Sequence, residues 1–413
     1  ADQMKENAGE VLIDVENRSY RLSEIAAKIL EKIKDVAQDH LEVPIQKAVV
    51  TVPAYFSDSQ RQAVKDAGKL IDLEVVRIIN EPTAAALAYG VGKGLHEKVL
   101  IYDLGGGTFD VSIIEIRDRT FEVKATGGDI FLGGLDFDAA LIRYVLDDFR
   151  AKHDIDLSRD PVAMQRIKDL AERTKIDLST RSEAAFNIPF IAMTPFAQPL
   201  NIEMRMTRDL LEELTGGLVD RTLETIASVM VDAGLGTSDI DEILLVGGQT
   251  RMPLLQERLT RYFGKAPSKA VHPDEAVAIG AALYAHSLQD DTNLRLQLLD
   301  VIPMAIGVEK ANGEMHVVFA RNSAIPNAKV LPVTTSYDGQ TEVAIRVYQG
   351  DHPIARDNEL LGELILSGLS PGPARSAKLE VTFDVSIEGI LRANARDVLS
   401  GRTVTSNIRI GPR

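Results

Sequence analysis

Residues 101–114 read IYDLGGGTFDVSII, and this stretch decides the fold. Apolar runs on both sides predict two strands, and between them stand an aspartate, three successive glycines and a threonine. A tight hairpin needs only one or two glycines. Three glycines predict a backbone without side chains, so that a bulky group can lie against its N–H groups. The first question is therefore what binds at Gly105, Gly106 and Gly107.

Asp103 and Thr108 stand on either side of these glycines and carry groups that could bind a metal ion and a phosphate. An aspartate at a strand end suits a hydrated magnesium ion, because Mg²⁺ prefers carboxylate oxygens and keeps most of its water. The glycine N–H groups would bind phosphate oxygens, and the Thr108 hydroxyl would reach a terminal phosphate. The segment is not a Walker loop, since no GK[ST] follows the glycines. A glycine-rich hairpin constrained only by packing remains the alternative.

A second glycine pair, Gly247 and Gly248, occurs in LLVGGQTRMP (244–253). The pattern predicts a strand, a glycine turn and a helix beginning near Pro253, which is typical of a phosphate or ribose site at a helix N-terminus. Glu81 in INEPTAAAL (79–87) also lies at a strand-to-helix junction. Its carboxylate either orders metal-bound water or occupies the first turn of the helix. The alternative for the glycine pair is an ordinary tight strand–helix turn.

A third polar cluster occurs in AERTKIDLS (171–179). Glu172, Lys175 and Ser179 stand at i, i+3 and i+7, so one face of a predicted helix carries all three. Together these groups would bind ribose hydroxyls and a purine edge, although a charged helix face is more often simply solvated. The glycine turns, Glu81 and this face jointly predict a nucleotide held between two lobes.

Length and composition restrict the class of protein. The chain has 413 residues, which predicts two or more domains. A formal net charge of -15 argues against nucleic acid and anionic membranes as partners. The absence of cysteine excludes disulfides and thiolate metal sites and agrees with a cytoplasmic location. No apolar run approaches the roughly 20 residues of a membrane helix.

Periodicity divides the chain into an α/β part and an all-β part. Strands and helices alternate up to about residue 288, and Ser57 and Gln60 stand in capping-box register at one predicted helix start. From Asp300 onward the period is two, with Asn-Gly and Asp-Gly turns, which predicts an antiparallel β-sandwich. We therefore expect an α/β domain over 1–288, a linker over 289–299 and a sandwich over 300–413.

Several segments resemble the DnaK-type heat shock protein 70 chaperone family, in the family's order and at about its spacing. They are AVVTVPAYFSDSQRQAVKDAG (48–68), RIINEPTAAALAYG (77–90), DLGGGTFDVS (103–112), LGGLDFD (132–138), LLVGGQTRMP (244–253) and HPDEAVAIGAA (272–282). The resemblance implies an actin-like (ribonuclease H-like) ATPase domain, an apolar interdomain linker and a β-sandwich that binds extended apolar peptides. It also implies ATP or ADP with Mg²⁺, and it allows K⁺ as a further cation.

The resemblance also implies roles for individual residues. The catalytic group is Glu81, Asp103, Thr108 and Asp110, with Asp103 and Glu81 holding the metal through water. The ATP-binding group is Gly105, Gly106, Gly107, Thr108, Gly128, Glu172, Lys175, Ser179, Gly247, Gly248, Gln249, Arg251 and Asp274. Coupling between nucleotide and sandwich falls to Pro53, Arg61, Arg77 and Asp300. The peptide-binding group is Ile306, Val308, Ala311, Val333, Ser336, Val343 and Ile345.

The implied partners are unfolded polypeptides, a J-domain cochaperone and a nucleotide-exchange factor. Three departures from the family pattern shape the expectations. The family's first phosphate loop and catalytic lysine do not precede Ala1, and its helical lid does not follow the sandwich, so we expect a piece of a larger protein with impaired ATPase activity by itself. Gln297 replaces an aliphatic linker residue, and burial of its amide would weaken docking. Ala311, Ser336 and Val333 replace larger or different cleft residues, which predicts a shallower peptide cleft.

Two other functions remain open at this stage. A small-molecule kinase or a filament protein could share the actin-like fold, although the predicted sandwich argues against both. A divergent homologue could sense nucleotide or dock partners without turnover, as Gln297, Ala311 and Ser336 would allow.

Overall fold

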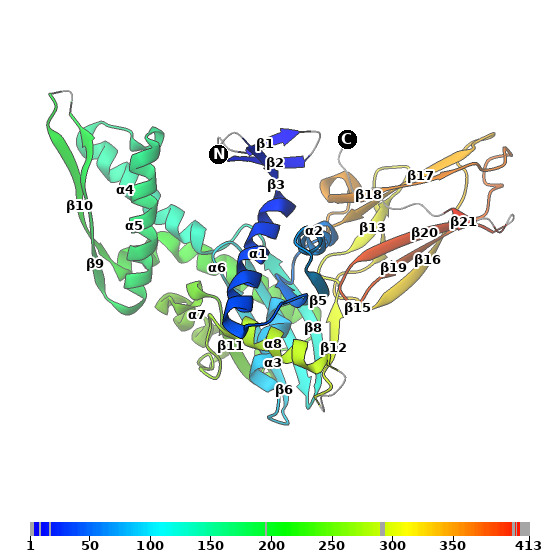
Figure 1. Cartoon of the computed structure of the whole chain (residues 1–413), viewed down its shortest axis with the longest axis horizontal. Helices are drawn as coiled ribbons and strands as arrows, with labels where there is room; N and C mark the ends of the chain where they lie inside the picture. The colour runs from blue at the N-terminus through cyan, green and yellow to red at the C-terminus, as the bar shows by residue number, and fades with distance from the viewer. Residues whose placement is uncertain are drawn as a thin grey trace.

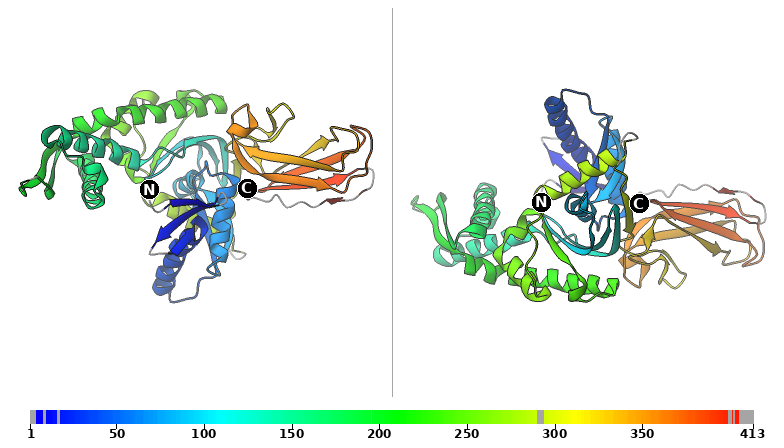
Figure 2. Two further views of the ribbon diagram at one scale, coloured as in Figure 1. Left: turned by 90° about the horizontal axis from the view of Figure 1, so that it is seen from above. Right: turned by 90° about the horizontal axis from the view of Figure 1, so that it is seen from below.

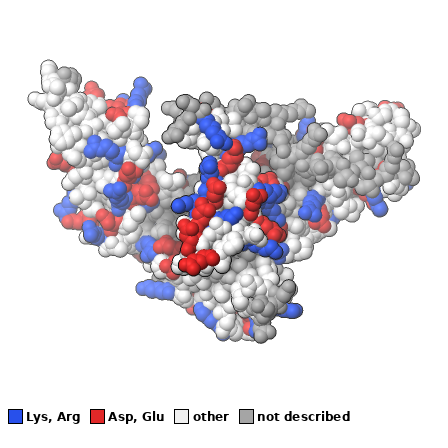
Figure 3. Space-filling model, viewed as in Figure 1, with Lys and Arg blue, Asp and Glu red and all other residues white. Residues whose placement is uncertain are grey.

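The computed structural model describes residues 4–7, 10–15, 18–194, 196–289, 294–398, 401 and 403–404. Figure 1 shows a mixed α/β part in the middle, a mostly helical lobe on one side and a β-sandwich on the other. Figure 2 shows the same division from two further directions. Acidic and basic side chains are interspersed over the face seen in Figure 3.

The centre of the molecule is a mixed sheet with the strand order β11-β6-β7-β8-β12-β15. Its first four strands are β11 (Glu242–Val246), β6 (His96–Leu104), β7 (Phe109–Arg117) and β8 (Thr120–Asp129). β6, β7 and β8 form an antiparallel meander, and β11 runs parallel to β6. These strands are almost continuously apolar because helices cover both faces of the sheet.

Helices α3 (Glu81–Gly90) and α8 (Ala276–Ser287) pack against each other beside this sheet. A Cβ on Gly280 would lie 1.7 Å from the Ala84 carbonyl oxygen, so the two helices approach as closely as glycine allows. Helix α6 (Arg208–Ala233) contacts β7 and β8. The sheet is thereby held between helices, as the alternating pattern predicts.

The mostly helical lobe extends from the sheet edge. It contains α4 (Gly134–His153), α5 (Pro161–Thr180), α7 (Pro253–Phe263) and the hairpin of β9 (Glu183–Met193) and β10 (Pro199–Thr207). α4 buries Phe137, Leu141, Val145 and Phe149, which recur every four residues and therefore share one face. This apolar stripe joins the core of the lobe to that of the sheet.

The N-terminal region adds smaller elements next to the centre. They are β1 (Met4–Asn7), β2 (Glu10–Val15), β3 (Arg18–Arg21), α1 (Leu22–Leu41), β4 (Lys47–Val52), α2 (Asp58–Lys69) and β5 (Glu74–Asn80). β1, β2 and β3 form one antiparallel sheet, and β4 pairs with β5 in parallel. The predicted capping box is confirmed, since the Ser57 N–H donates to Gln60 Oε1 over 2.9 Å.

The all-β part consists of two antiparallel four-stranded sheets. One sheet contains β14 (Met315–Phe319), β13 (Ile306–Glu309), β17 (Glu342–Gln349) and β18 (Glu359–Ser367); the other contains β16 (Asn327–Val333), β19 (Leu379–Val385), β20 (Leu391–Asp397) and β21 (Thr403–Val404). Alternate residues such as Val347, Leu364, Val381 and Phe383 fill the space between the sheets. The short 3₁₀ helices within the described residues are Leu157–Arg159, Thr237–Asp239, Gly248–Arg251 and Ala355–Asp357.

The end of the predicted linker is a strand rather than a free connection. β12 (Gln297–Val301) pairs in parallel with β8 through residues 297–299. Through residues 300–301 it pairs in antiparallel with β15 (Ala324–Ile325). The expectation that Gln297 buries its amide is wrong, because this side chain is exposed while Leu298 and Leu299 are partly buried. Backbone pairing attaches the strand whatever side chain stands at 297.

Candidate functional site

The two glycine turns predicted from the sequence lie side by side. β6 and β11 are parallel neighbours with Asp103 opposite Val246, so the turns that follow them meet at one sheet edge. Gly247 has a φ of 86°, and a Cβ on it would lie 2.4 Å from the Leu104 carbonyl oxygen. Only glycine fits this position. We refer to Gly105–Gly107 and Gly247–Gly248 as the glycine cradle.

The cradle leaves backbone amides without partners. Gly106 and Gly107 are exposed, and a Cβ on either would meet nothing within 4 Å. Their N–H groups donate to no acceptor in the part of the chain that the structure describes. The carbonyl oxygens are occupied instead: Gly105 O and Gly106 O accept from the N–H groups of Gly134 and Leu135 at 2.9 and 2.8 Å. The loop is fixed from one side while its amides stay available to an anion.

Three carboxylates lie beside the cradle. Asp103 and Asp110 are opposite each other on β6 and β7, and both are buried. Burial, with the charges of Glu81 and Asp110, holds the pKa of Asp103 well above its ordinary value. Burial and Glu81 raise the pKa of Asp110 to about 7, against the opposing effects of the Tyr55 N–H and Arg61. Burial also raises the pKa of Glu81.

This acid cluster fits a cation. The Asp103 carboxylate accepts no hydrogen bond from the described residues, so its charge lacks a protein partner in a low-dielectric place. Among the residues placed by the structure, no group of three or more His, Asp or Glu side chains is close enough to ligate a metal directly. A magnesium ion bound through its water molecules, as expected here, does not require three direct protein ligands.

The helix face predicted from AERTKIDLS lies on α5 next to α4. The Lys175 side chain is only 12% exposed, and its Nζ lies 2.9 Å from Gly134 O and 2.9 Å from Asp138 Oδ1. Glu172 is exposed, while the Ser179 hydroxyl donates to the Lys175 carbonyl oxygen of its own helix over 3.4 Å. Lys175 therefore contacts Gly134, whose N–H donates to Gly105 O of the cradle, and the other two side chains stay on the helix face.

The remaining predicted ATP-binding residues surround the same edge. A Cβ on Gly128 would lie 2.9 Å from Asp110 Oδ1, which places this glycine against the acid cluster. Arg251 pairs with Asp274 at 2.5 Å beside Gly248. Gln249 is buried, with its Nε2 3.6 Å from the Met252 sulfur, so its side chain lies in the interior. Thr108 is partly buried, and its carbonyl oxygen closes the loop by accepting from the Gly105 N–H.

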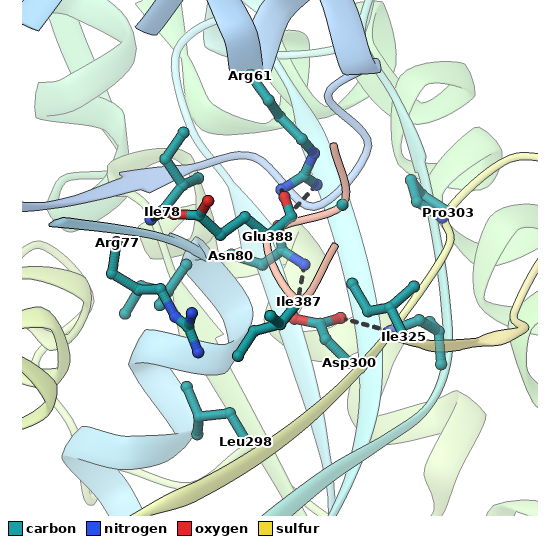
Figure 4. A pocket seen from close by; sticks show the side chains of 13 residues that line it. Arg61, Arg77, Ile78, Asn80, Leu298, Asp300, Pro303, Ile325, Ile387 and Glu388 are labelled. Atoms are coloured by element: carbon teal, nitrogen blue, oxygen red, sulfur yellow. Dashed lines mark hydrogen bonds between the residues drawn. The ribbon is translucent and has the colours of Figure 1, made fainter. Parts of the chain in front are cut away.

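The predicted coupling residues lie where the sandwich meets the centre. Arg61 is buried and donates to Asn80 Oδ1 at 2.8 Å and to the carbonyl oxygens of Ala54 and Phe56. Asn80 Nδ2 in turn donates to Asp300 Oδ2 over 2.8 Å. Figure 4 shows these side chains around one small cavity, which Arg77 also lines. Pro53 is partly buried at the end of β4.

The sandwich residues that take part in this contact were not predicted from the sequence. Glu388 reaches across to accept from the Ile78 N–H at 3.1 Å, and its carboxylate pairs with Lys65. Asp58 accepts from the Leu391 N–H at 2.6 Å, and the Asp58 N–H donates to Gln349 Oε1 over 3.0 Å. No sequence signal distinguishes these polar residues from ordinary loop and helix-start residues. We call Asp58, Arg61, Asn80, Asp300 and Glu388 the domain junction.

Burial governs the ionisation of the junction. It raises the pKa of Asp58 to about 6, although the Leu391 N–H and Arg61 oppose the rise. It also raises the pKa of Asp300 and lowers that of Arg61. A second polar contact lies nearby, where Arg321 pairs with Asp232 of α6 at 2.9 Å. The sandwich therefore meets the centre through charged and polar groups.

The predicted peptide-binding residues fall into two sets. Ile306, Val308, Val343 and Ile345 are buried in the sandwich core, and Val333 packs against that core. Ala311 and Ser336 are exposed. The residues of the first set therefore pack in or against the sandwich core. The peptide-binding role of both sets stays a prediction.

Comparison with known proteins agrees with this geometry. The family model for Hsp70 protein matches residues 2–412. Proteins named Chaperone protein DnaK from Thermotoga petrophila, Thermotoga maritima and Thermotoga neapolitana are 50% identical over 394 residues. The match covers 94% of this chain and 66% of each relative, so the chain spans just under two thirds of their length. Within the described residues, no helix is long and apolar enough to span a membrane. The chain belongs to the Hsp70 family.

Proposed function

We propose that this protein is an ATP-dependent molecular chaperone that binds extended apolar segments of unfolded polypeptides under the control of nucleotide. The convergence of two glycine turns beside a buried acid cluster supports this proposal most strongly. A chaperone of this kind also needs a separate peptide-binding domain whose affinity the nucleotide can change. The sandwich, which is attached to the same sheet through β12, is the candidate for this domain. Membership of the Hsp70 family supports both parts.

In the proposed site, the amides of Gly105–Gly107 and the Thr108 hydroxyl bind phosphate oxygens. Asp103 and Glu81 hold a magnesium ion through water, and Asp110 completes the acid cluster. The ion, when bound, neutralises phosphate charge. The protein's task is then to hold the phosphates in line with an attacking water, because phosphoryl transfer depends mainly on positioning and electrostatics. Glu172, Lys175, Ser179, Gly248 and Arg251 lie on the adenosine side.

Transmission to the sandwich would run through the domain junction. Asp110 accepts from the Tyr55 N–H at 3.1 Å, and Tyr55 lies in the segment between β4 and α2 that also carries the carbonyl oxygens bound by Arg61. A displacement of Asp110 would therefore move Tyr55, and with it the neighbouring carbonyl oxygens of Ala54 and Phe56 that Arg61 binds. We propose that nucleotide state sets how firmly the junction holds the sandwich, and thereby the affinity for peptide.

The remaining proposals rest on the resemblance. They are a J-domain cochaperone and a nucleotide-exchange factor as partners, a cytoplasmic location, and a role in protein folding and the stress response. K⁺ is a further candidate cation.

The test is to measure the dissociation rate of a fluorescent apolar peptide from the intact protein with and without MgATP. We expect MgATP to accelerate dissociation, and Asp103→Asn to abolish the acceleration. Asp148→Asn, at the partly exposed ion pair with Lys152 on α4, is the matched control and should behave as the unmodified protein. A peptide affinity that is the same with and without bound nucleotide would refute the proposal.

A further inference from the structure

The side chain of Lys175, on α5, is held by residues of the neighbouring helix α4. Its ammonium leaves the α5 surface, is largely buried, and lies against the first turn of α4. There it donates to Gly134 O over 2.9 Å. The Gly134 N–H in turn donates to Gly105 O over 2.9 Å. One chain of contacts thus links α5 to the glycine cradle through a single glycine residue.

Asp138 holds the other side of this ammonium. Its side chain is 9% exposed, and Oδ1 lies 2.9 Å from Lys175 Nζ. That oxygen accepts no directed hydrogen bond within the described residues, so the contact depends on charge. Asp138 stands one helical turn after Gly134 on α4, so both face the same ammonium. Asp138 ends the segment LGGLDFD (132–138), and none of the roles assigned above belongs to it.

The geometry around Gly134 leaves the ammonium little freedom. A Cβ on Gly134 would lie 3.0 Å from Lys175 Nζ and 3.2 Å from Gln249 Oε1. Gln249 follows the second glycine turn, so Gly134 lies next to Gly105 of the first turn and next to the residue after the second. A free lysine side chain loses considerable rotamer entropy when it is fixed. A buried carboxylate that fixes it beforehand removes that loss from ligand binding.

We propose that Asp138 is a positioning residue for nucleotide: its carboxylate fixes the Lys175 ammonium against Gly134, so that α5 and the glycine cradle form one rigid site before the ligand arrives. The inference rests on the proposed nucleotide binding. Asp138 acts through Lys175 and touches no ligand itself.

The first test is Asp138→Asn in the intact protein, with MgATP and MgADP as probes. We expect about a tenfold weaker nucleotide affinity, seen as a higher KM, while single-turnover hydrolysis at saturating MgATP keeps its rate. A merely structural role would instead lower the active fraction and the saturated rate. Asp148→Asn is the matched control, since Asp148 pairs with Lys152 on the same helix at 2.7 Å and is away from the cradle.

The second test is a double-variant cycle with Lys175→Met. If Asp138 acts through Lys175, Asp138→Asn weakens affinity no further in the Lys175→Met protein. Additive effects would overturn the inference. Gly134→Ala offers a separate route, because its methyl group displaces the ammonium without changing any charge, and alanine is the better helix former. We expect it to weaken nucleotide binding as well.

The outcomes separate the two proposals. If the unmodified protein binds no adenine nucleotide, the proposed function fails. If it binds nucleotide and neither Asp138→Asn nor Gly134→Ala changes KM, only the role of Asp138 fails.

Discussion

The glycine cradle is made of backbone, whereas the domain junction is made of side chains. In the cradle, Gly106 and Gly107 leave space, and their amides have no acceptor among the residues that the structure describes. In the junction, Arg61 is buried, Asp300 is partly buried, and each has several partners. The difference shows what each region is for: a surface that receives a ligand keeps polar groups free, and a surface that holds two domains together satisfies them. Variants in the two regions should therefore fail in different ways.

The largest effect is expected from Arg61→Met in the junction. Removing a buried guanidinium leaves Asn80, Asp300 and two carbonyl oxygens without a donor or countercharge, which should cost about 3–5 kcal/mol in unfolding free energy. Urea unfolding of the intact protein measures this. Arg117→Met is the control, because Arg117 is 55% exposed in its pair with Glu115 and should change stability little. Equal effects of the two variants would show that the junction is not held by Arg61.

Gly247→Ala should be nearly as damaging in the cradle. The new methyl group would clash with Leu104 O and force alanine to a φ of 86°, at a combined cost of about 3 kcal/mol. Gly106→Ala sharpens the contrast, because its methyl group enters open space. We expect it to leave the melting temperature unchanged and to weaken MgADP binding. Differential scanning fluorimetry with and without MgADP distinguishes the two, and a loss of stability in Gly106→Ala would contradict the assignment.

A moderate effect of pH on domain docking is expected at the junction. Burial at the junction raises the pKa of Asp58 from its ordinary value to about 6, so the docked state binds the proton more tightly. This contribution to docking is complete at low pH and is lost as pH rises through about 6, which amounts to about 1 kcal/mol between about pH 5 and 7.5. Fluorescence energy transfer between the two domains measures the docked fraction. Asp58→Asn keeps an acceptor for the Leu391 N–H and should reduce the pH dependence; docking that strengthens as pH rises would reverse the sign.

The smallest effect is expected from Gln297→Leu. The side chain is exposed, so domain docking should change by less than about 0.5 kcal/mol. Leu298→Gln is the matched variant one residue later, where the side chain packs against the core beside α3 and α8. It should reduce the same energy-transfer signal clearly. Equal responses at 297 and 298 would mean that β12 lies in another register.

These contrasts also explain which features the sequence predicts. The glycine turns are encoded locally, and parallel neighbouring strands bring Gly105 and Gly247 to the same edge. Glu388 and Asp58 have no such marker, because their meaning depends on a partner about 300 residues away. The prediction for Gln297 was wrong because a shift of one residue along a strand changes the face on which a side chain lies. For Ile306 and Val343, a period of two predicts the core and does not separate core from ligand surface.

β12 has a mechanical consequence. Leu299 is the last residue paired with β8 and Asp300 is the first paired with β15, so no slack chain lies between the two attachments. A pull on the sandwich is therefore delivered directly to the ladder along β8. Separation of the domains would require this ladder to open, and the backbone of residues 297–299 would then be a bare strand edge.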